Sequence, residues 1–346
     1  MSLPDVLLAL LIVSLAAYAV LGGADFGAGF WDLTAGGAER GSRIRGLIKR
    51  SMGPVWEANH VWLIVVLVIM WTCFPRAFGP LMETLYVPLF LASVGIIFRG
   101  AAFALRGQAA TISEARALGA VFALSSVLVP FFLGCALGAV ASGRVPAEGD
   151  PGAVFSSWTG ETSIFAGLMA VAVGAYVAAV FLAGDATRAG LDDLAEAFRR
   201  RALGAALVAG ALSVAGLLVV KDDAPQLWDG LTSGLGLAAV IVAGAIGAVT
   251  LALIASRRYE AARYGSGLAV GAVLTGMALA MRPDFLPGEL SFADAAAGDS
   301  TLIATLIALL FALAVIVPSI WWLFKLTLEG RLSDAYQPLL QGKEER

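Results

Sequence analysis

The stretch that decides the fold is the N-terminal run of residues 3–29, LPDVLLALLIVSLAAYAVLGGADFGAG, which is apolar almost throughout. It is longer than the roughly 20 apolar residues that a helix needs to cross a membrane. The run ends in Gly22-Gly-Ala-Asp25-Phe-Gly27-Ala-Gly29, where small residues surround one acid. Small residues let helix backbones approach closely in lipid, so this segment predicts a first spanning helix that packs tightly against others.

The composition of the whole chain indicates the same class. Of its 346 residues 59% are hydrophobic and 14% are charged, and the mean hydropathy is +0.85. Soluble domains carry about 25% charged residues, so a polytopic membrane protein is predicted. The net charge of −3 excludes a nucleic-acid partner, and two cysteines exclude a disulfide scaffold. The single histidine, His60, excludes a cofactor site built on several histidines, and no metal site is predicted.

Nine apolar stretches have the length of a membrane-spanning helix, and in lipid a helix satisfies its own backbone hydrogen bonds. They are residues 4–29, 54–74, 81–99, 117–142, 163–183, 202–220, 231–255, 265–281 and 301–325. We therefore predict an all-α fold with nine transmembrane helices and no inserted soluble domain. A faint echo between Ala17-Tyr18…Asp25 and Ala175-Tyr176…Asp185 is consistent with two repeated bundles, although alanine-rich helices also produce such echoes by chance.

The orientation follows from the positions of lysine and arginine, which favour the cytoplasmic side of a membrane. With the N-terminus outside, 18 of the 23 basic residues fall on cytoplasmic segments and four on outer segments, while Arg99 ends a helix. The distribution predicts an N-terminus outside and a cytoplasmic C-terminus.

Ionisable side chains inside the spans are rare, because each costs about 2.5–3.5 kcal/mol on insertion scales unless it is paired or faces water or protein. Four of them fall at comparable depth near the inner border of the first three spans: Asp25, Glu57, His60 and Arg99. This group is consistent with a buried proton relay that opens to the cytoplasm. The alternative is a set of border residues that pair for packing or lie among lipid headgroups.

Five short motifs follow one another along the chain. They are the run at Asp25, Pro54-Val-Trp56-Glu57-Ala-Asn59-His60-Val-Trp62-Leu63, Arg99-Gly100-Ala-Ala102-Phe103-Ala104-Leu-Arg106, Gly134-Cys-Ala136-Leu137-Gly138 and Asp294-Ala-Ala-Ala297. In these motifs, nearly end to end, the chain resembles subunit II of the cytochrome bd family of terminal quinol oxidases.

The resemblance implies two four-helix bundles, residues 1–142 and 163–281, followed by a peripheral ninth helix and a cytoplasmic tail at 301–346. It implies a complex in the bacterial plasma membrane that oxidises quinol and reduces O2 to water in the respiratory chain. The partner, subunit I, holds the haems (b and d, or b-type variants). A small single-span subunit, lipid and, in some members, a structural quinone accompany it.

For this chain the resemblance implies a non-catalytic subunit that ligates no cofactor. It forms a scaffold and part of the cytoplasmic proton route, with Asp25, Glu57 and Arg99 at the family's polar positions. The remaining motif residues are expected to be structural: Trp56, Asn59, Trp62, Gly27, Gly29 and Gly100.

The chain departs from the family pattern at four motif positions. Gly22 and Ala104 replace acids, Ala58 replaces a glycine, and His60 stands where an acid or an amide is usual. Our hypothesis is that His60 and Glu57 together replace the missing acids in proton transfer.

Two other functions fit the same residues. A secondary transporter can also carry a charge cluster between repeated bundles, and an assembly scaffold needs no proton handling. Co-purification with a haem-containing partner favours the oxidase subunit or the scaffold, whereas activity of the chain alone in liposomes favours the transporter.

Overall fold

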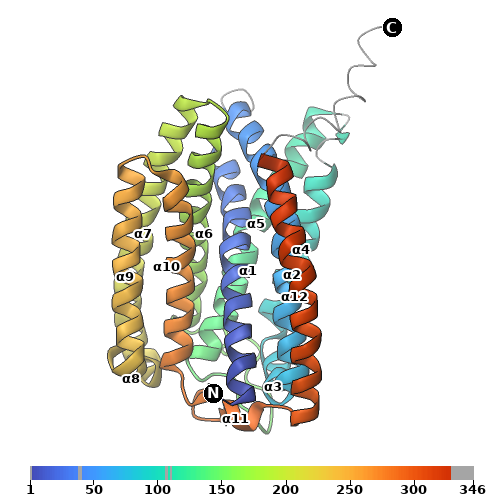
Figure 1. The fold of residues 1–346 in the computed structure, drawn as a ribbon, viewed down its shortest axis with the longest axis vertical. Helices are drawn as coiled ribbons and strands as arrows, with labels where there is room; N and C mark the ends of the chain where they lie inside the picture. The colour runs from blue at the N-terminus through green and yellow to red at the C-terminus, as the bar shows by residue number, and fades with distance from the viewer. Residues whose placement is uncertain (1, 38–40, 106–107, 110, 329–346) are drawn as a thin grey trace.

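The computed structural model of the chain describes residues 2–37, 41–105, 108–109 and 111–328 (Figure 1). These residues form helices and one two-stranded antiparallel sheet. In chain order the elements are α1 (Leu3–Leu33), α2 (Ser42–Cys73), α3 (Pro75–Thr84), α4 (Tyr86–Leu105), α5 (Ile112–Ala141), α6 (Glu161–Arg188), α7 (Asp192–Asp223), α8 (Pro225–Thr232), α9 (Gly234–Ala255), α10 (Tyr259–Ala280), β1 (Asp284–Leu286), β2 (Leu290–Ser291), α11 (Phe292–Ala295) and α12 (Asp299–Leu328).

Helix starts follow from local sequence. The Ser2 hydroxyl accepts a hydrogen bond from the backbone N–H of Asp5, and the Asp5 carboxylate accepts one from the N–H of Ser2, which makes a capping box at the start of α1. Pro75 and Pro225 open the short helices α3 and α8. At this position a proline loses no helical hydrogen bond, because the first N–H groups of a helix have no partner within it.

The two halves of the chain repeat one order of helices: long, long, short, long, long, from α1 to α5 and from α6 to α10. In the first half α1 packs on α2 and α5, and α4 packs on α5; in the second, α6 packs on α7 and α9 on α10. Contact between α1 and α6 joins the halves, and α12 lies against α2 and α1 (Figure 1). The division into two four-helix bundles, residues 1–142 and 163–281, stays a prediction.

Glycine permits the closest approach between helices. A Cβ atom on Gly27 of α1 would lie 2.0 Å from the backbone oxygen of Gly174 in α6. A Cβ atom on Gly29 would lie 2.2 Å from the hydroxyl oxygen of Ser126 in α5. Both distances are shorter than any real carbon contact, so the packing of α1 requires glycine at these positions.

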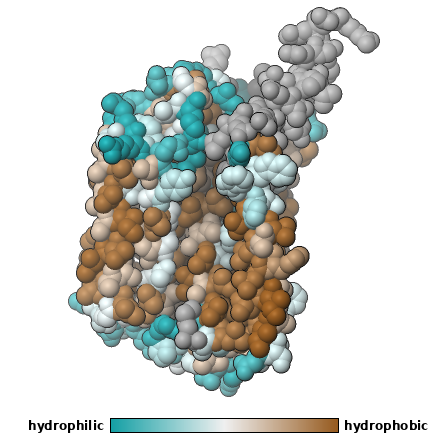
Figure 2. All heavy atoms as spheres, in the orientation of Figure 1, coloured by the Kyte–Doolittle hydropathy of each residue, from teal (hydrophilic) through white to brown (hydrophobic). Residues whose placement is uncertain are grey.

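On the face shown in Figure 2, an apolar band crosses the middle of the molecule and separates two more hydrophilic ends. Large apolar side chains are exposed on its outer helices, among them Leu235 of α9 at 70% and Phe311 of α12 at 74%. An apolar surface of this extent is suited to lipid rather than water, so the chain is a multi-pass membrane protein.

Seven helices among the described residues are long and apolar enough to cross a membrane, or eight if α3 and residues 58–73 of α2, bent by 116°, form one span. The expected span 265–281 corresponds to α10, which is not among the seven. The expected span 54–74 enters only through the bent pair. The polytopic helical class is therefore confirmed, while nine spans and the orientation stay predictions.

One boundary prediction was wrong. The stretch 81–99 was expected to be a single span, but residues 81–84 end α3 and a new helix begins at Tyr86. Apolar composition continues across the break, so hydropathy alone does not reveal it. In addition, the segment 282–300, predicted to be an outer loop, contains β1, β2 and α11, which lie at the same end of the molecule as the N-terminus (Figure 1).

Candidate functional site

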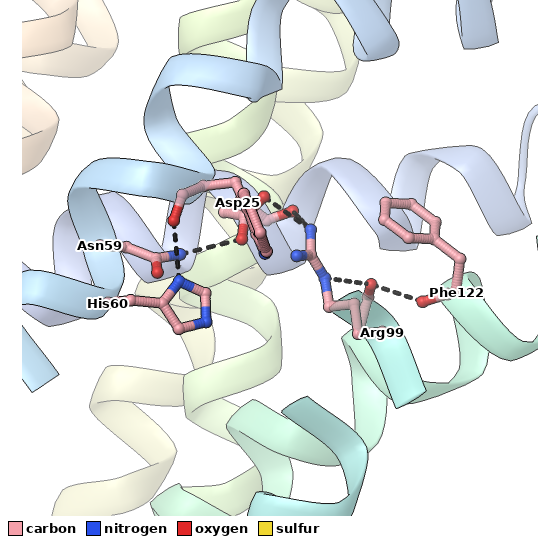
Figure 3. Close-up of polar contacts among 7 residues, drawn as sticks. Asp25, Asn59, His60, Arg99 and Phe122 are labelled. Carbon is pink, nitrogen blue, oxygen red and sulfur yellow. Dashed lines mark hydrogen bonds and ion pairs between the residues drawn. The ribbon is translucent and has the colours of Figure 1, made fainter. Parts of the chain in front are cut away.

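Four helices of the first half place one polar side chain each at a common point inside the protein. Asp25 comes from α1, Asn59 from α2, Arg99 from α4 and Ser126 from α5. All four are buried, and Figure 3 shows the Asp25 carboxylate turned toward Arg99 and the Asn59 amide turned toward Asp25. We call these four residues the Asp25–Arg99 cluster.

The centre of the cluster is a buried ion pair. Arg99 Nη2 lies 2.6 Å from Asp25 Oδ1, and the two side chains are 2% and 1% exposed. The same nitrogen donates to the backbone oxygen of Asp25 at 3.1 Å. Burying either charged group alone in this setting is costly, and the contact between the two side chains offsets part of that cost.

Asn59 completes the coordination of the carboxylate. Its Nδ2 donates to Asp25 Oδ2 at 2.9 Å, so the two carboxylate oxygens accept from different partners (Figure 3). Its own Oδ1 is buried and has no hydrogen-bond partner among the described residues. Asn59 was expected only to be structural, and the geometry makes it a direct ligand of the acid.

Ser126 and two aromatic rings hold the guanidinium. Arg99 Nε donates to Ser126 Oγ at 2.9 Å, and Ser126 Oγ donates to the backbone oxygen of Phe122 at 2.6 Å. The guanidinium carbon lies 5.0 Å from the centre of the Phe26 ring and 4.7 Å from that of Phe122. Cations are attracted to aromatic faces at these distances.

Sequence reasoning missed Ser126 and both phenylalanines. A serine in the middle of an apolar span was a usable signal, because a buried hydroxyl needs a partner. The phenylalanines gave no signal, since aromatic residues are common throughout the spans.

His60 lies next to the cluster without joining it. Its ring Nδ1 is 2.8 Å from the backbone oxygen of Trp56, and the two rings meet edge to face at 5.4 Å. In the described part of the chain no hydrogen bond connects His60 with Asp25 or Arg99. The side chain of Glu57 lies outside the described residues, although its backbone belongs to α2.

The structural motif residues fall into two groups. Gly27 and Gly29 are needed for close packing, as described above, whereas a Cβ atom on Gly100 would meet the Trp56 ring at an ordinary 3.7 Å. Trp56 stacks on Phe103 with a centroid distance of 5.9 Å. Trp62 packs against a small apolar cluster that includes Phe26 and Tyr18.

The second half contains an ion pair of the same residue types. Arg263 Nη2 of α10 lies 2.5 Å from Asp185 Oδ1 of α6, and their side chains are 19% and 18% exposed. Asp185 also pairs with Arg188 at 3.2 Å. This pair is more open than the Asp25–Arg99 cluster, which makes it a matched control for experiments.

Within the described residues, no group of three or more His, Cys, Asp or Glu side chains has the geometry of a metal site. Cys73 and Cys135 are buried free thiols. The Asp25–Arg99 cluster offers the chemistry of a carboxylate held by an arginine and an amide inside an apolar bundle. Such a group can hold or pass a proton where water reaches it.

Comparisons with known proteins agree on one family. The family model described as "Cytochrome bd terminal oxidase subunit II" matches residues 3–327. The chain is 29% identical over 133 residues to cytochrome bd ubiquinol oxidase subunit 2 of Bacillus subtilis (strain 168), and the alignment covers 38% of each protein. It thus spans well under two thirds of the length of that relative.

A solved structure has the same fold. A chain in the structure of bd oxidase from Geobacillus thermodenitrificans superposes with a TM-score of 0.80 at 22% sequence identity. The superposition covers 94% of this chain and 98% of that one. At this identity the likeness establishes the fold alone.

Proposed function

The chain belongs to the family of cytochrome bd terminal oxidase subunit II, and from that membership we propose that it is subunit II of a complex that oxidises quinol and reduces O2 to water. The match of the family model to residues 3–327 and the fold shared with a chain of a bd oxidase support the proposal. The partner is a haem-bearing subunit I in the same membrane, to which this chain contributes no haem ligand.

We further propose that the Asp25–Arg99 cluster belongs to the route by which protons from the cytoplasm reach the partner's reaction site. The observation that carries this step is the ion pair of Asp25 and Arg99, which is 1–2% exposed and ligated by Asn59. Reduction of O2 to water consumes protons, and a proton cannot cross an apolar bundle without polar groups. Charges placed inside a membrane protein at such cost are commonly retained for function.

A double variant tests the role of the cluster. Breaking a buried pair by removing one partner costs about 3–5 kcal/mol, so Asp25→Asn and Arg99→Gln should be introduced together. In the purified complex we expect normal haem content, read from a reduced-minus-oxidised spectrum. Quinol-driven O2 consumption should fall roughly ten-fold or more, because proton transfer then limits turnover.

The matched control is Asp185→Asn with Arg263→Gln, which removes an ion pair of the same types from the second half. It should retain wild-type turnover. Equal turnover of the two double variants would contradict the proton-route assignment. Transport activity of the chain alone in liposomes, without any co-purifying haem protein, would contradict the oxidase proposal and favour a secondary transporter.

A further inference from the structure

Tyr18 is a buried tyrosine whose hydroxyl the Asp25–Arg99 cluster does not use. It is the midpoint of α1 (Leu3–Leu33), and the residue is 8% exposed. Its hydroxyl oxygen is buried and finds no hydrogen-bond partner anywhere in the described ranges. A buried polar group without a partner costs about 1–3 kcal/mol, so its presence requires an explanation.

Apolar side chains from four helices surround the ring. Tyr18 clusters with Phe26 of α1 and Val129 of α5, and the partly buried residues that pack against this cluster are Trp62, Leu63, Ile96 and Leu133. A phenylalanine would suit such surroundings as well as a tyrosine does. The hydroxyl therefore adds nothing to the packing.

Tyr18 lies on the same face of α1 as Asp25 of the cluster. Ser14, Tyr18, Gly22 and Asp25 are spaced four, four and three residues apart, so they share one face of the helix, and all four are buried. A Cβ atom on Gly22 would lie 3.5 Å from Tyr18 Cε2, the ring carbon next to the one that bears the hydroxyl. Phe26 Cε2 lies at the same 3.5 Å from that point, so the Tyr18 and Phe26 rings both lie against the helix at Gly22, between Tyr18 and Asp25.

A second unpartnered atom belongs to the Asp25–Arg99 cluster itself. Asn59 Oδ1 is buried without a partner in the described part of the chain, while Nδ2 of the same amide binds Asp25. Tyr18 is also near enough to Asp25 and Arg99 to interact with both charges. Two buried oxygens with free hydrogen-bonding capacity near one carboxylate are the surroundings in which internal water binds.

We propose that Tyr18 is a proton-relay residue that extends the Asp25–Arg99 cluster along α1 by means of internal water; this step rests on the proposed function of the cluster. The hydroxyl oxygen accepts a proton from water on the Asp25 side and releases its own proton to water on the far side. The tyrosine is neutral before and after the transfer, and no electron moves.

The test is Tyr18→Phe in the complete complex, which removes one oxygen and keeps the ring. Because no protein group loses a hydrogen-bond partner, haem content should match the wild type and thermal stability should not fall. O2 consumption should fall roughly three- to ten-fold, since a relay step is lost, and its solvent deuterium isotope effect should rise.

Tyr176→Phe is the matched control. Tyr176 stands at the echo position in α6, is 7% exposed, and is not among the unpartnered buried groups of the described residues. It should leave both turnover and isotope effect unchanged. A Tyr18→Phe complex that turns over like the wild type, fails to assemble, or is no slower than Tyr176→Phe would overturn the relay.

The variant Asp25→Asn with Arg99→Gln, measured in parallel, separates the two proposals. If it is slow while Tyr18→Phe is fast, only the relay is overturned and the cluster keeps its role. If both are fast, the proton-route assignment fails as well.

Discussion

Burying the Arg99 guanidinium is energetically unfavourable, and its contacts in the cluster offset that free energy. Among the described residues it is the largest fully buried side chain. The guanidinium has one carboxylate partner, two neutral oxygen acceptors and two aromatic rings. Removing it from water costs several kcal/mol. An ion pair offsets this desolvation only when further hydrogen bonds are also made. The members of the cluster therefore depend on one another, because removing one leaves the others buried without their partners.

The lost acids of the family pattern lead to a prediction at the residue scale. If Glu57 and His60 replace them, Glu57→Gln with His60→Gln should slow quinol-driven O2 consumption roughly ten-fold or more, because two proton-exchanging groups become inert. The His60 ring contacts backbone rather than the ion pair, so the haem spectrum of the variant complex should be unchanged. The control is Glu83→Gln in α3, near the opposite end of the spans, which should leave O2 consumption unchanged. Normal turnover in the double variant would refute the replacement hypothesis.

At the scale of elements, α1 is the helix on which the fold depends. It packs on α2, α5, α6 and α10, so it touches both halves. Its glycines serve two purposes. Gly27 allows the close approach of α6. Gly29 leaves room for Ser126, which accepts a hydrogen bond from Arg99. Packing and site geometry are thereby linked in one turn of helix.

Gly27→Ala tests this link. The added methyl group would overlap the backbone oxygen of Gly174, and backbone cannot move aside as a flexible side chain can. We expect the helices to separate, with a loss of at least about 3 kcal/mol in stability, at the upper end of the costs of overpacking. The measurement is the melting temperature and yield of the detergent-solubilised complex. Gly46→Ala in α2, where a Cβ atom meets open space, should change neither; equal effects of the two substitutions would show that the contact is not limiting.

On the scale of the whole molecule, charge and apolar surface together predict how the protein sits in a membrane. An apolar band crosses its middle on the face shown in Figure 2, and 18 of 23 basic residues fall on segments predicted to be cytoplasmic. The short elements α3, α8 and α11 lie at the opposite end, beside the N-terminus (Figure 1). The outside N-terminus stays a prediction that rests on the distribution of basic residues.

Single-cysteine labelling tests the orientation. In a background with Cys73 and Cys135 replaced, a cysteine at position 148 should react with a membrane-impermeant maleimide in intact spheroplasts. A cysteine at position 260 should react only after permeabilisation. The native residues there are Glu148, which is 89% exposed in its side chain, and Glu260, which is 63% exposed. The reverse pattern would invert the predicted topology.

The sequence by itself determined that the chain is a polytopic helical membrane protein and which polar residues are candidates for the site. A membrane tolerates only long apolar helices and few charges, so composition identified the spanning segments and made Asp25, His60 and Arg99 conspicuous. Motif order identified the family resemblance. These properties follow from the free energy of transfer into lipid, which is a sum over residues and can be read along the chain.

Only the tertiary structure decided which of those residues meet. Asp25 and Arg99 are 74 positions apart yet form one ion pair, Asn59 joins it, and His60 bonds to its own helix instead. The break between α3 and α4 and the unpartnered hydroxyl of Tyr18 also escaped prediction. The reason is that the direction in which a side chain points, and its depth in the bundle, depend on how each helix is rotated and how closely it approaches its neighbours. Packing between distant segments sets that rotation and approach, and local composition does not.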